Sequence, residues 1–337
     1  MKAAVYLGPR HLEIRDVPIP SVGENDVLVK VAYCGICGTD VHIYHGDGGA
    51  ADVTPPLIIG HEFSGVVEKV GANVKKLKAG DKVSVNPNDM CGECAFCHDG
   101  MEHFCEHFTG IGTTVNGGFA EYCVASESTV YKTDSLDLLQ AAMVEPLSCC
   151  VHGIDLCGIH PGDSVLVIGT GPIGLLMLQL AKLAGAGMVI AAVRSDAKAQ
   201  LAMSMGADRV INTTVADLKS TLAGFCKNLN CVIECVGNPR TIEQAVDVAG
   251  KGATVMLFGL TGPDATVEIK PDTIFKKELK VTSSFINPYT YSRSIALLET
   301  GRVDVTSMIR NIIPLEELEN ALATDTLRRQ GKVVVKL

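Results

Sequence analysis

Runs of apolar residues along the chain differ in pattern before and after about residue 150. In the first part, short runs rich in β-branched side chains, such as AAVYL and DVLVKVAYC, end at Gly, Pro, Asn or Asp. Runs of this length bounded by turn-forming residues are typical of β-strands. The pattern therefore predicts a mostly β region of short, irregular strands.

From about residue 150, predicted strands alternate with predicted helices. DSVLVIG, MVIAAV, CVIECVG and ATVMLFG are nearly continuous apolar runs, as expected for parallel strands that are buried on both faces. GLLMLQLAKLAG, DAKAQLAMSMG and TIEQAVDVAG lie between them and have helical apolar spacing. This alternation predicts a doubly wound α/β domain. Two more helices and a last strand, GKVVVKL, follow from about residue 285, and we expect that strand to pair with the first region.

A glycine-rich turn links the first predicted parallel strand to the helix after it. In this context one glycine makes a tight turn, the next lets the backbone approach a pyrophosphate, and the third allows close packing of helix on strand. The N-terminus of the helix then faces the phosphates. The turn predicts a dinucleotide site, and an ordinary glycine turn is the alternative. The candidate residues are Gly169, Gly171, Pro172, Ile173 and Gly174.

The end of the second parallel strand favours NADP(H) over NAD(H). Units that bind NAD usually place Asp or Glu there to bond the ribose 2′-hydroxyl, but this chain has Val193, followed by Arg194 and Ser195. A guanidinium matches a 2′-phosphate in charge and geometry, and Lys198 adds a second positive charge. NAD(H) remains possible if Arg194 is a solvated surface residue and Asp196 serves as a displaced acid.

Four cysteines lie close together in the first region, with two residues between the first three. Four soft thiolates suit a closed, structural zinc site with no position open for water. Iron–sulfur ligation and a thiol redox switch are competing interpretations, and the neighbouring His98, His103 and His107 are possible substitute ligands. The four candidate ligands are Cys91, Cys94, Cys97 and Cys105.

A second, scattered set of candidate ligands occurs in CGICGTDVH, GHEFSG and EPLSCC. A catalytic zinc needs few protein ligands and an open position, and Cys, His and Glu can supply such a mixed set. Spacing alone does not establish this site.

These motifs, in this order, resemble the zinc-dependent medium-chain dehydrogenases, and EPLSCCVHG is similar to their polyol, or sorbitol-type, branch. The resemblance covers essentially the whole chain. It implies an α/β protein with a mostly β GroES-like catalytic domain over residues 1–149. A Rossmann domain with a doubly wound parallel sheet is implied over residues 150–285, and residues 286–337 would return to the catalytic domain.

The resemblance also implies the ligands of a catalytic zinc. Cys37 and His61 would bind the ion directly. Glu62 would be a direct or exchangeable ligand, and Glu145 would either bind the ion or hold a water bound to it. With the four-cysteine site, the implied content is two zinc ions per chain.

The implied chemistry is hydride transfer between a secondary alcohol and NADP(H), or NAD(H). Thr39 matches the position whose hydroxyl accepts the substrate proton, and His42 matches an outward relay position. The expected substrate is a small polyol or sugar alcohol, or a ketose in the reverse direction. A threonine- or butanediol-type dehydrogenase of the same family remains an alternative. So does a cofactor-binding protein without catalysis, although the intact set of site residues argues against it.

One departure weakens a sorbitol assignment. In sorbitol-type enzymes an arginine and an aromatic residue follow a phenylalanine in the C-terminal part of the chain. Here Phe285 is followed by Ile286 and Asn287. Asn287 and Tyr289 are instead candidate contacts to substrate hydroxyls.

The composition narrows the possible partners. The 337 residues include 29 Lys and Arg against 38 Asp and Glu, a formal charge of −9. This balance speaks against broad capture of nucleic acid or of a membrane surface. A zinc-ribbon nucleic-acid binder is also disfavoured, because CGECAFCHDGMEHFCEH contains no Lys or Arg.

The remaining patterns concern location and assembly. No apolar run approaches the roughly 20 residues that span a bilayer, and the N-terminal segment does not resemble a signal peptide. We therefore expect a cytoplasmic protein whose thirteen cysteines form no disulfide framework. The eight cysteines without a metal role should mostly be packed as small apolar residues. The family resemblance implies a homo-oligomer, either a tetramer or a dimer.

Overall fold

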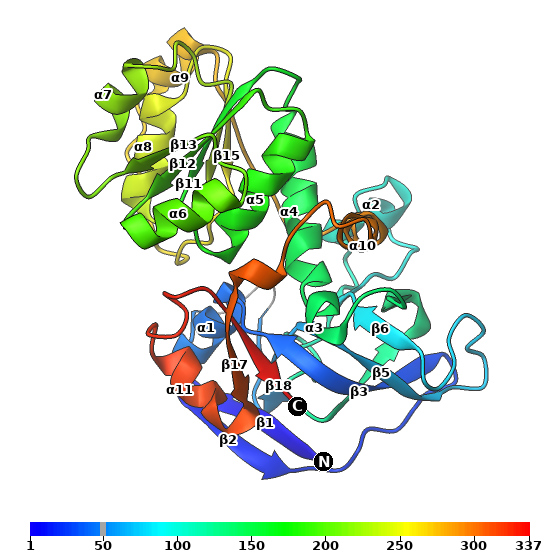
Figure 1. The fold of residues 1–337 in the computed structure, drawn as a ribbon. Helices are drawn as coiled ribbons and strands as arrows, with labels where there is room; N and C mark the ends of the chain where they lie inside the picture. Colours follow the sequence, from blue (N-terminus) through cyan, green and yellow to red (C-terminus); the bar gives the residue numbers. More distant parts are fainter. Residues whose placement is uncertain (48–51) are drawn as a thin grey trace. The chain divides into compact units, whose positions relative to one another are not determined.

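The chain folds into two compact units. The computed structural model describes residues 1–47 and 52–337 (Figure 1). Unit 1 comprises Met1–Ser148 and Ile286–Leu337, and unit 2 comprises Cys149–Phe285.

Unit 1 is centred on a seven-stranded sheet with the order β10-β6-β5-β3-β18-β17, in which β9 also pairs with β3. Alternate residues of the central strand β3, Val27, Val29 and Val31, are buried in the core, as expected for a strand with one face on the core. The strands of this sheet are β3 (Asp26–Gly35), β5 (Glu62–Val70), β6 (Lys82–Val85), β9 (Tyr122–Ser126), β10 (Val130–Lys132), β17 (Ile309–Pro314) and β18 (Lys332–Lys336).

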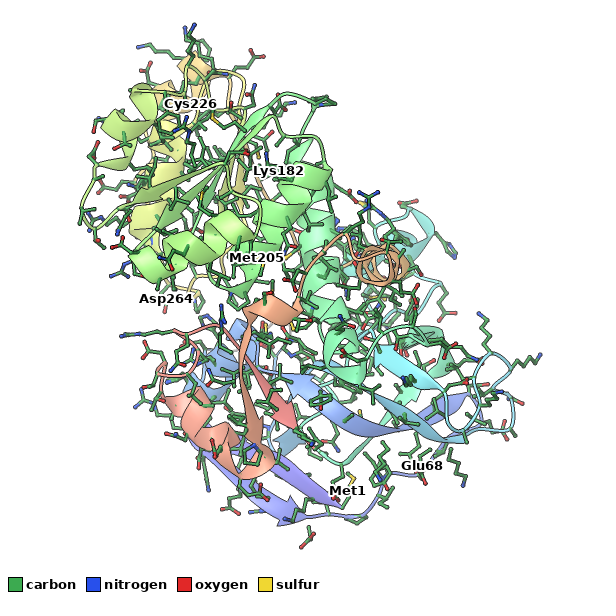
Figure 2. The ribbon with its side chains drawn as sticks, in the orientation of Figure 1. Met1, Glu68, Lys182, Met205, Cys226 and Asp264 are labelled. Atoms are coloured by element: carbon green, nitrogen blue, oxygen red, sulfur yellow. The ribbon has the colours of Figure 1, made fainter. Side chains whose placement is uncertain are left out.

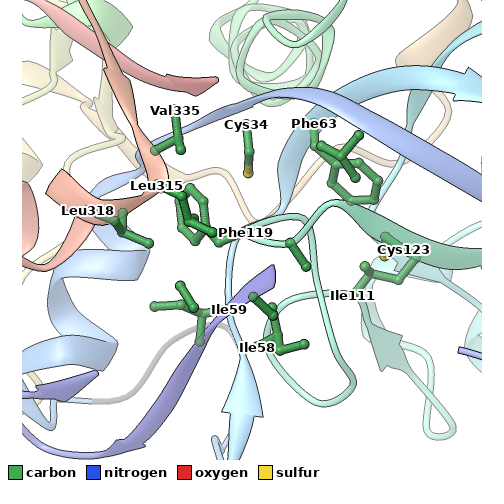
Figure 3. Packing of buried hydrophobic residues seen from close by; sticks show 14 of the residues in the cluster. Cys34, Ile58, Ile59, Phe63, Ile111, Phe119, Cys123, Leu315, Leu318 and Val335 are labelled. Carbon is green, nitrogen blue, oxygen red and sulfur yellow. The ribbon is translucent and has the colours of Figure 1, made fainter. Parts of the chain in front are cut away.

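The C-terminal strand β18 lies inside this sheet. It pairs antiparallel with β3, with Val334 opposite Gly35, and parallel with β17. Val335 from β18 and Leu315 and Leu318 from the same C-terminal region pack in one core with Cys34, Ile59 and Phe119 (Figure 3). The last segment of the chain is therefore part of the core of unit 1.

Smaller sheets and short helices complete unit 1. One sheet has the order β2-β1-β4, and a second pairs β7 with β8. These strands are β1 (Lys2–Gly8), β2 (His11–Asp16), β4 (Leu57–Ile58), β7 (Asn88–Asp89) and β8 (Thr109–Gly110). The helices are α1 (Gly38–His45), α2 (Ala95–His98), α3 (Leu138–Ala141), α4 (Val144–Cys157), α10 (Tyr291–Glu299) and α11 (Leu318–Ala323), and α4 continues into unit 2.

Unit 2 contains a six-stranded parallel sheet with the order β13-β12-β11-β14-β15-β16. The chain order reverses beside β11, which makes its carboxyl end the topological switch point where such sheets bind ligands. The strands are β11 (Ser164–Ile168), β12 (Met188–Val193), β13 (Arg209–Asn212), β14 (Cys231–Glu234), β15 (Thr254–Leu257) and β16 (Lys280–Ser283).

The helices of unit 2 are α5 (Pro172–Leu183), α6 (Asp196–Ser204), α7 (Leu218–Ala223), α8 (Pro239–Val248) and α9 (Pro271–Lys277). Lys182 lies in the last turn of α5 (Figure 2). Its Nζ pairs with Oδ2 of Asp208 at 2.6 Å. The parallel sheet and the mostly β unit 1 confirm the predicted α/β fold class. Within the described ranges, no helix is both long and apolar enough to cross a membrane.

Candidate functional site

Helix α1 positions the first candidate ligand of the scattered set. Cys37 is the residue before α1, and its backbone N–H donates to Oδ2 of Asp40 at 2.8 Å. This bond belongs to a capping box, which fixes the start of the helix. Asp40 is fully buried. The cap thus holds the Cys37 thiol and a buried carboxylate side by side.

The start of β5 brings two further candidates to Cys37. Ligand atoms of Cys37, His61 and Glu62 lie within 4.8 Å of one another. Gly60 turns the chain into this strand with φ +97°, where a Cβ atom would lie 2.6 Å from the Phe119 ring. A side chain at position 60 would therefore force the Phe119 ring or the backbone before His61 to shift.

The chemistry of this group fits a zinc ion. A thiol, an imidazole and a carboxylate form the mixed donor set of a zinc site that has an open position. Nδ1 of His61 and Oδ1 of Asp40 are buried and 3.3 Å apart, and neither atom has another hydrogen-bond partner within residues 1–47 and 52–337. A proton on Nδ1 would face Asp40 and leave Nε2 of His61 as the ligand atom.

Glu62 has a buried partner that the sequence analysis did not find. Lys332, in β18, forms an ion pair with Oε2 of Glu62 and donates to the carbonyl oxygen of Ile36 at 3.0 Å. Burial lowers the pKa of Lys332, but the charges of Glu62 and Cys37 raise it further, so its pKa lies above the ordinary value. The lysine therefore stays charged and offsets the negative charge of the candidate ligand Glu62.

Gly35 makes room for this ion pair. A Cβ atom at this position would overlap Oε2 of Glu62 and lie 2.9 Å from Cε of Lys332. The motif CGICG thus has two roles: Cys37 supplies a thiol, and Gly35, which has no side chain, leaves space for the ion pair.

The other candidates for the catalytic group lie on two helices. Thr39 is half-buried in the first turn of α1, and His42 follows one turn later on the same face. Nδ1 of His42 is 3.4 Å from Oδ2 of Asp47. Glu145 is buried in the first turn of α4. Across the described ranges, the close ligand group contains Cys37, His61 and Glu62 but does not include Glu145.

The four cysteines of the first motif form a second close group in unit 1. Four of the distances between their Sγ atoms are 3.4, 3.6, 3.9 and 4.0 Å. Four sulfurs placed tetrahedrally at a Zn–S distance of about 2.3 Å would be about 3.8 Å apart. The spacing therefore fits a closed zinc site made by Cys91, Cys94, Cys97 and Cys105. His98, His103 and His107 are not members of this group.

Backbone N–H groups surround these sulfurs. The N–H groups of Glu93 and Cys94 donate to Sγ of Cys91 at 3.4 and 3.3 Å. Hydrogen bonds from the backbone lower the pKa of Cys94 to about 6, which favours the thiolate form that binds metals. All thirteen cysteines are free, so no disulfide competes for these thiols.

A pocket of about 640 Å³ lies in unit 2 at the carboxyl ends of the parallel strands. Five of the predicted cofactor residues line it: Gly169, Gly171, Val193, Arg194 and Lys198. The lining also includes Thr170, whose buried hydroxyl has no hydrogen-bond partner among the residues that the structure describes. A buried hydroxyl of this kind beside a pocket can be satisfied by an ordered water or by a polar ligand.

The other predicted cofactor residues support the pocket without lining it. Gly174 packs α5 against the turn, because a Cβ atom there would overlap the carbonyl oxygen of Gly169. Pro172 and Ile173 are the first residues of α5. Ser195 caps α6 and accepts the N–H of Lys198 at 3.4 Å.

The structure disfavours Asp196 as a displaced acid for the ribose. Its Oδ1 accepts a hydrogen bond from Asn212 at 3.0 Å, and Asp196 does not line the pocket. Among the described lining residues there is no Asp or Glu.

The sequence analysis missed the pocket wall that follows β14. Asn238, Arg240 and Thr241 line the pocket there. They could have been found from their place directly after CVIE, because parallel strands end at the same edge of a sheet.

Asn287 does not serve as an open contact for substrate. It is 2% exposed, and its amide bonds Oδ1 of Asn86 at 3.2 Å and Oγ of Ser148 at 2.7 Å and accepts from Asn88 at 2.7 Å. The residue therefore joins the start of the C-terminal segment to the rest of unit 1. Tyr289 is 61% exposed and has φ +56°.

Comparisons with known proteins agree with the fold and indicate the family of the chain. Residues 23–135 match the alcohol dehydrogenase GroES-like domain, and residues 172–300 match the zinc-binding dehydrogenase domain. The chain is 34% identical to D-arabinitol dehydrogenase 1 of Uromyces fabae, over 100% of this chain and 97% of that protein. It is 35% identical to L-threonine 3-dehydrogenase of Bacillus velezensis, over 96% of this chain and 94% of that protein.

Two solved structures are also similar to it. One is the NADP-bound structure of a candidate zinc-binding dehydrogenase from Sinorhizobium meliloti 1021, with 37% identity, a TM-score of 0.95 and coverage of 100% and 99%. The other is an alcohol dehydrogenase from Escherichia coli CFT073 in complex with NADH, with 30% identity, a TM-score of 0.92 and coverage of 100% and 99%.

The chain therefore belongs to the zinc-dependent medium-chain dehydrogenase family. This confirms the predicted family and the GroES-like and Rossmann folds of its domains. The protein is an oxidoreductase of the polyol and alcohol dehydrogenase type.

Proposed function

We propose that this protein oxidises a secondary alcohol of a polyol or sugar alcohol, and reduces the ketose in reverse, with NADP(H) as its preferred cofactor. The observation that carries the cofactor proposal is the lining of the pocket in unit 2. Arg194, Lys198 and Arg240 line it, and none of its described lining residues is acidic. Such a lining suits a ribose that carries a 2′-phosphate.

The substrate proposal rests on the donor set in unit 1 and on relatives. Cys37, His61 and Glu62 are suited to a zinc ion with an open position for an alcohol oxygen. The similarity to D-arabinitol dehydrogenase 1 supports a polyol. The similarity to L-threonine 3-dehydrogenase makes L-threonine, a β-hydroxy amino acid, the second candidate.

A bound zinc ion would act as a Lewis acid toward the alcohol oxygen, and a bound nicotinamide would accept the hydride. The protein's own contribution begins with charge. A Cys37 thiolate and the Glu62 carboxylate are offset by Lys332, which lies at hydrogen-bonding distance from Glu62. Asp40 holds the orientation of the His61 ring from its Nδ1 side.

Thr39 and His42 provide the route for the proton. In this proposal the Thr39 hydroxyl takes the proton of the alcohol, and His42 passes it toward solvent. The position of His42 supports this order, because its side chain is 28% exposed and faces the exposed Asp47.

A panel of substrates with both cofactors tests the proposal. Steady-state kinetics would be measured for polyols, ketoses, their phosphates, small diols and L-threonine with NADP(H) and NAD(H). We expect the highest kcat/KM for a polyol or ketose with NADP(H), and Arg194→Ala should reduce kcat/KM selectively with NADP(H). Equal use of both cofactors would contradict the cofactor proposal. Preference for L-threonine would contradict the substrate proposal.

A further inference from the structure

Arg240 holds a fixed place at the rim of the pocket. It is the second residue of α8, and its backbone N–H donates to Oδ1 of Asn238 at 3.0 Å. Glu234, which is fully buried at the end of β14, holds the loop between β14 and α8 by hydrogen bonds. Its Oε1 accepts from the N–H of Val236 and from the hydroxyl of Thr241, each at 2.8 Å. The start of α8 is therefore anchored on both sides of Arg240.

The charge of Arg240 is unfavourable where it stands. A cation in the first turn of a helix opposes the helix dipole. The side chain is exposed, and no ion pair or hydrogen bond to its guanidinium occurs in the parts of the chain that the structure describes. The Arg194 side chain is also exposed, and its guanidinium likewise has no ion pair or hydrogen bond among the described residues. Both side chains are therefore free to bind an anion from the pocket that they line.

The sheet order places the two arginines on opposite sides of the glycine turn. β12 and β14 both pair with β11, one on each side, and Arg194 and Arg240 follow β12 and β14. Strands two positions apart in a sheet are separated by roughly 10 Å. Two extended arginine side chains can reach a single phosphate group across that distance.

We propose that Arg240 is a second specificity-determining residue for NADP(H), which binds the 2′-phosphate from the wall opposite Arg194. This inference deepens the proposed function and rests on it. Two guanidinium groups then hold a dianionic phosphate from two directions, each by charge-assisted hydrogen bonds. The alternative roles for Arg240 are contact with the pyrophosphate or with the adenine ring, which NADP(H) and NAD(H) share.

Equilibrium binding to the full chain distinguishes these roles. Dissociation constants would be measured for NADPH, NADH, 2′,5′-ADP and 5′-AMP by fluorescence or calorimetric titration. The proteins compared would be the wild type, Arg240→Ala, Arg240→Lys and Arg194→Ala. Lys251→Ala serves as the matched control, because Lys251 is an exposed cation of unit 2 outside the pocket lining.

We expect Arg240→Ala to raise the dissociation constants of NADPH and 2′,5′-ADP by about tenfold or more, which is the usual effect of losing a charged hydrogen bond. The dissociation constants of NADH and 5′-AMP should change by less than about twofold, since these molecules lack the 2′-phosphate. Arg240→Lys should recover part of the loss, and Lys251→Ala should bind all four molecules as the wild type does.

Two outcomes would overturn the inference: unchanged binding of NADPH in Arg240→Ala, or equal weakening of NADPH and NADH. Arg194→Ala separates this failure from failure of the cofactor proposal. If Arg194→Ala loses NADPH selectively while Arg240→Ala does not, only the role of Arg240 is wrong. If wild-type protein does not prefer NADPH, the cofactor proposal fails as well.

Discussion

Lys332 is the only lysine or arginine among the buried polar side chains of the described residues, and it forms an ion pair with the candidate metal ligand Glu62. Lys332→Met would remove this charge and leave the Glu62 carboxylate buried without its partner. Breaking a buried pair in this way costs about 3–5 kcal/mol. Urea denaturation in zinc-containing buffer should therefore show a large loss in the free energy of unfolding.

Lys336→Met is the matched control for this prediction. Lys336 lies on the same strand, β18, but is exposed, so its replacement should change the stability by less than about 0.5 kcal/mol. Adding Glu62→Gln to Lys332→Met should recover part of the loss, because the unpaired charge is then absent. If the two methionine variants were equally stable, the ion pair would not stabilise the fold.

Thr39 tests the proton route at the scale of one hydroxyl. Thr39→Ala should lower kcat by about 10²-fold or more, the usual contribution of a positioned proton-transfer group. Thr39→Ser keeps the hydroxyl and should retain most of the activity. Zinc content should stay unchanged in both variants, since Thr39 is outside the ligand group. Unchanged turnover in Thr39→Ala would exclude the relay role.

Residues differ in how far their roles could be predicted from the sequence. Cys37, His61 and Glu62 occur in short motifs. The spacing of these motifs did not establish the site, and the family resemblance that they carry brought the three residues into one hypothesis. Lys332 contacts Glu62, which lies 270 positions earlier in the chain, and no local sequence pattern predicts that ion pair. Arg240 resembles any exposed helical arginine until the order of the strands is known.

At the scale of elements, two glycines near the start of α5 have different roles: Gly174 allows α5 to pack on the glycine turn, and Gly171 leaves space in the pocket. Gly174→Ala should destabilise unit 2, because its Cβ atom would overlap the Gly169 carbonyl oxygen and push α5 away from β11. Gly171→Ala should fold normally, since it has φ −70° and open space around its Cβ position. That open space belongs to the pocket, so Gly171→Ala should still weaken dinucleotide binding.

Thermal melting and NADPH titration of the two variants check this division. The expected result is a lower Tm for Gly174→Ala alone, and weaker binding with an unchanged Tm for Gly171→Ala. Normal binding by Gly171→Ala would show that the dinucleotide does not approach the turn closely.

Elements with a clear apolar pattern were predictable, and those without one were not. β11 and β12 are buried on both faces, and their continuous apolar runs predicted them. β16 is an edge strand with the burial pattern of an exposed segment, so KVTS has no strand-like alternation of apolar residues. The first turns of α4 are buried nearly all round, which removes the amphipathic spacing that identifies a surface helix.

At the scale of the whole molecule, the two ligand groups predict two zinc ions per chain. Metal analysis of Cys37→Ser should find about one ion, with loss of activity. Cys97→Ser should also lose one ion, together with a lower Tm, because a structural zinc contributes to folding. Cys226→Ser, in neither group, should keep the wild-type content. A wild-type chain with one ion, unchanged by Cys37→Ser, would contradict the catalytic site.

Because β18 is the last strand of the chain and belongs to the sheet of unit 1, unit 2 can complete its folding before unit 1 during synthesis on the ribosome. Cys149–Phe285 emerges complete, so unit 2 can fold while the chain is still growing, as domains generally do. Unit 1 cannot finish at that time, because β3 must wait for a strand that is synthesised after all of unit 2. The Glu62 carboxylate likewise waits for Lys332. A ribosome-bound chain that stops short of residue 332 would therefore expose an unfinished unit 1 to chaperones and proteases while unit 2 is already folded.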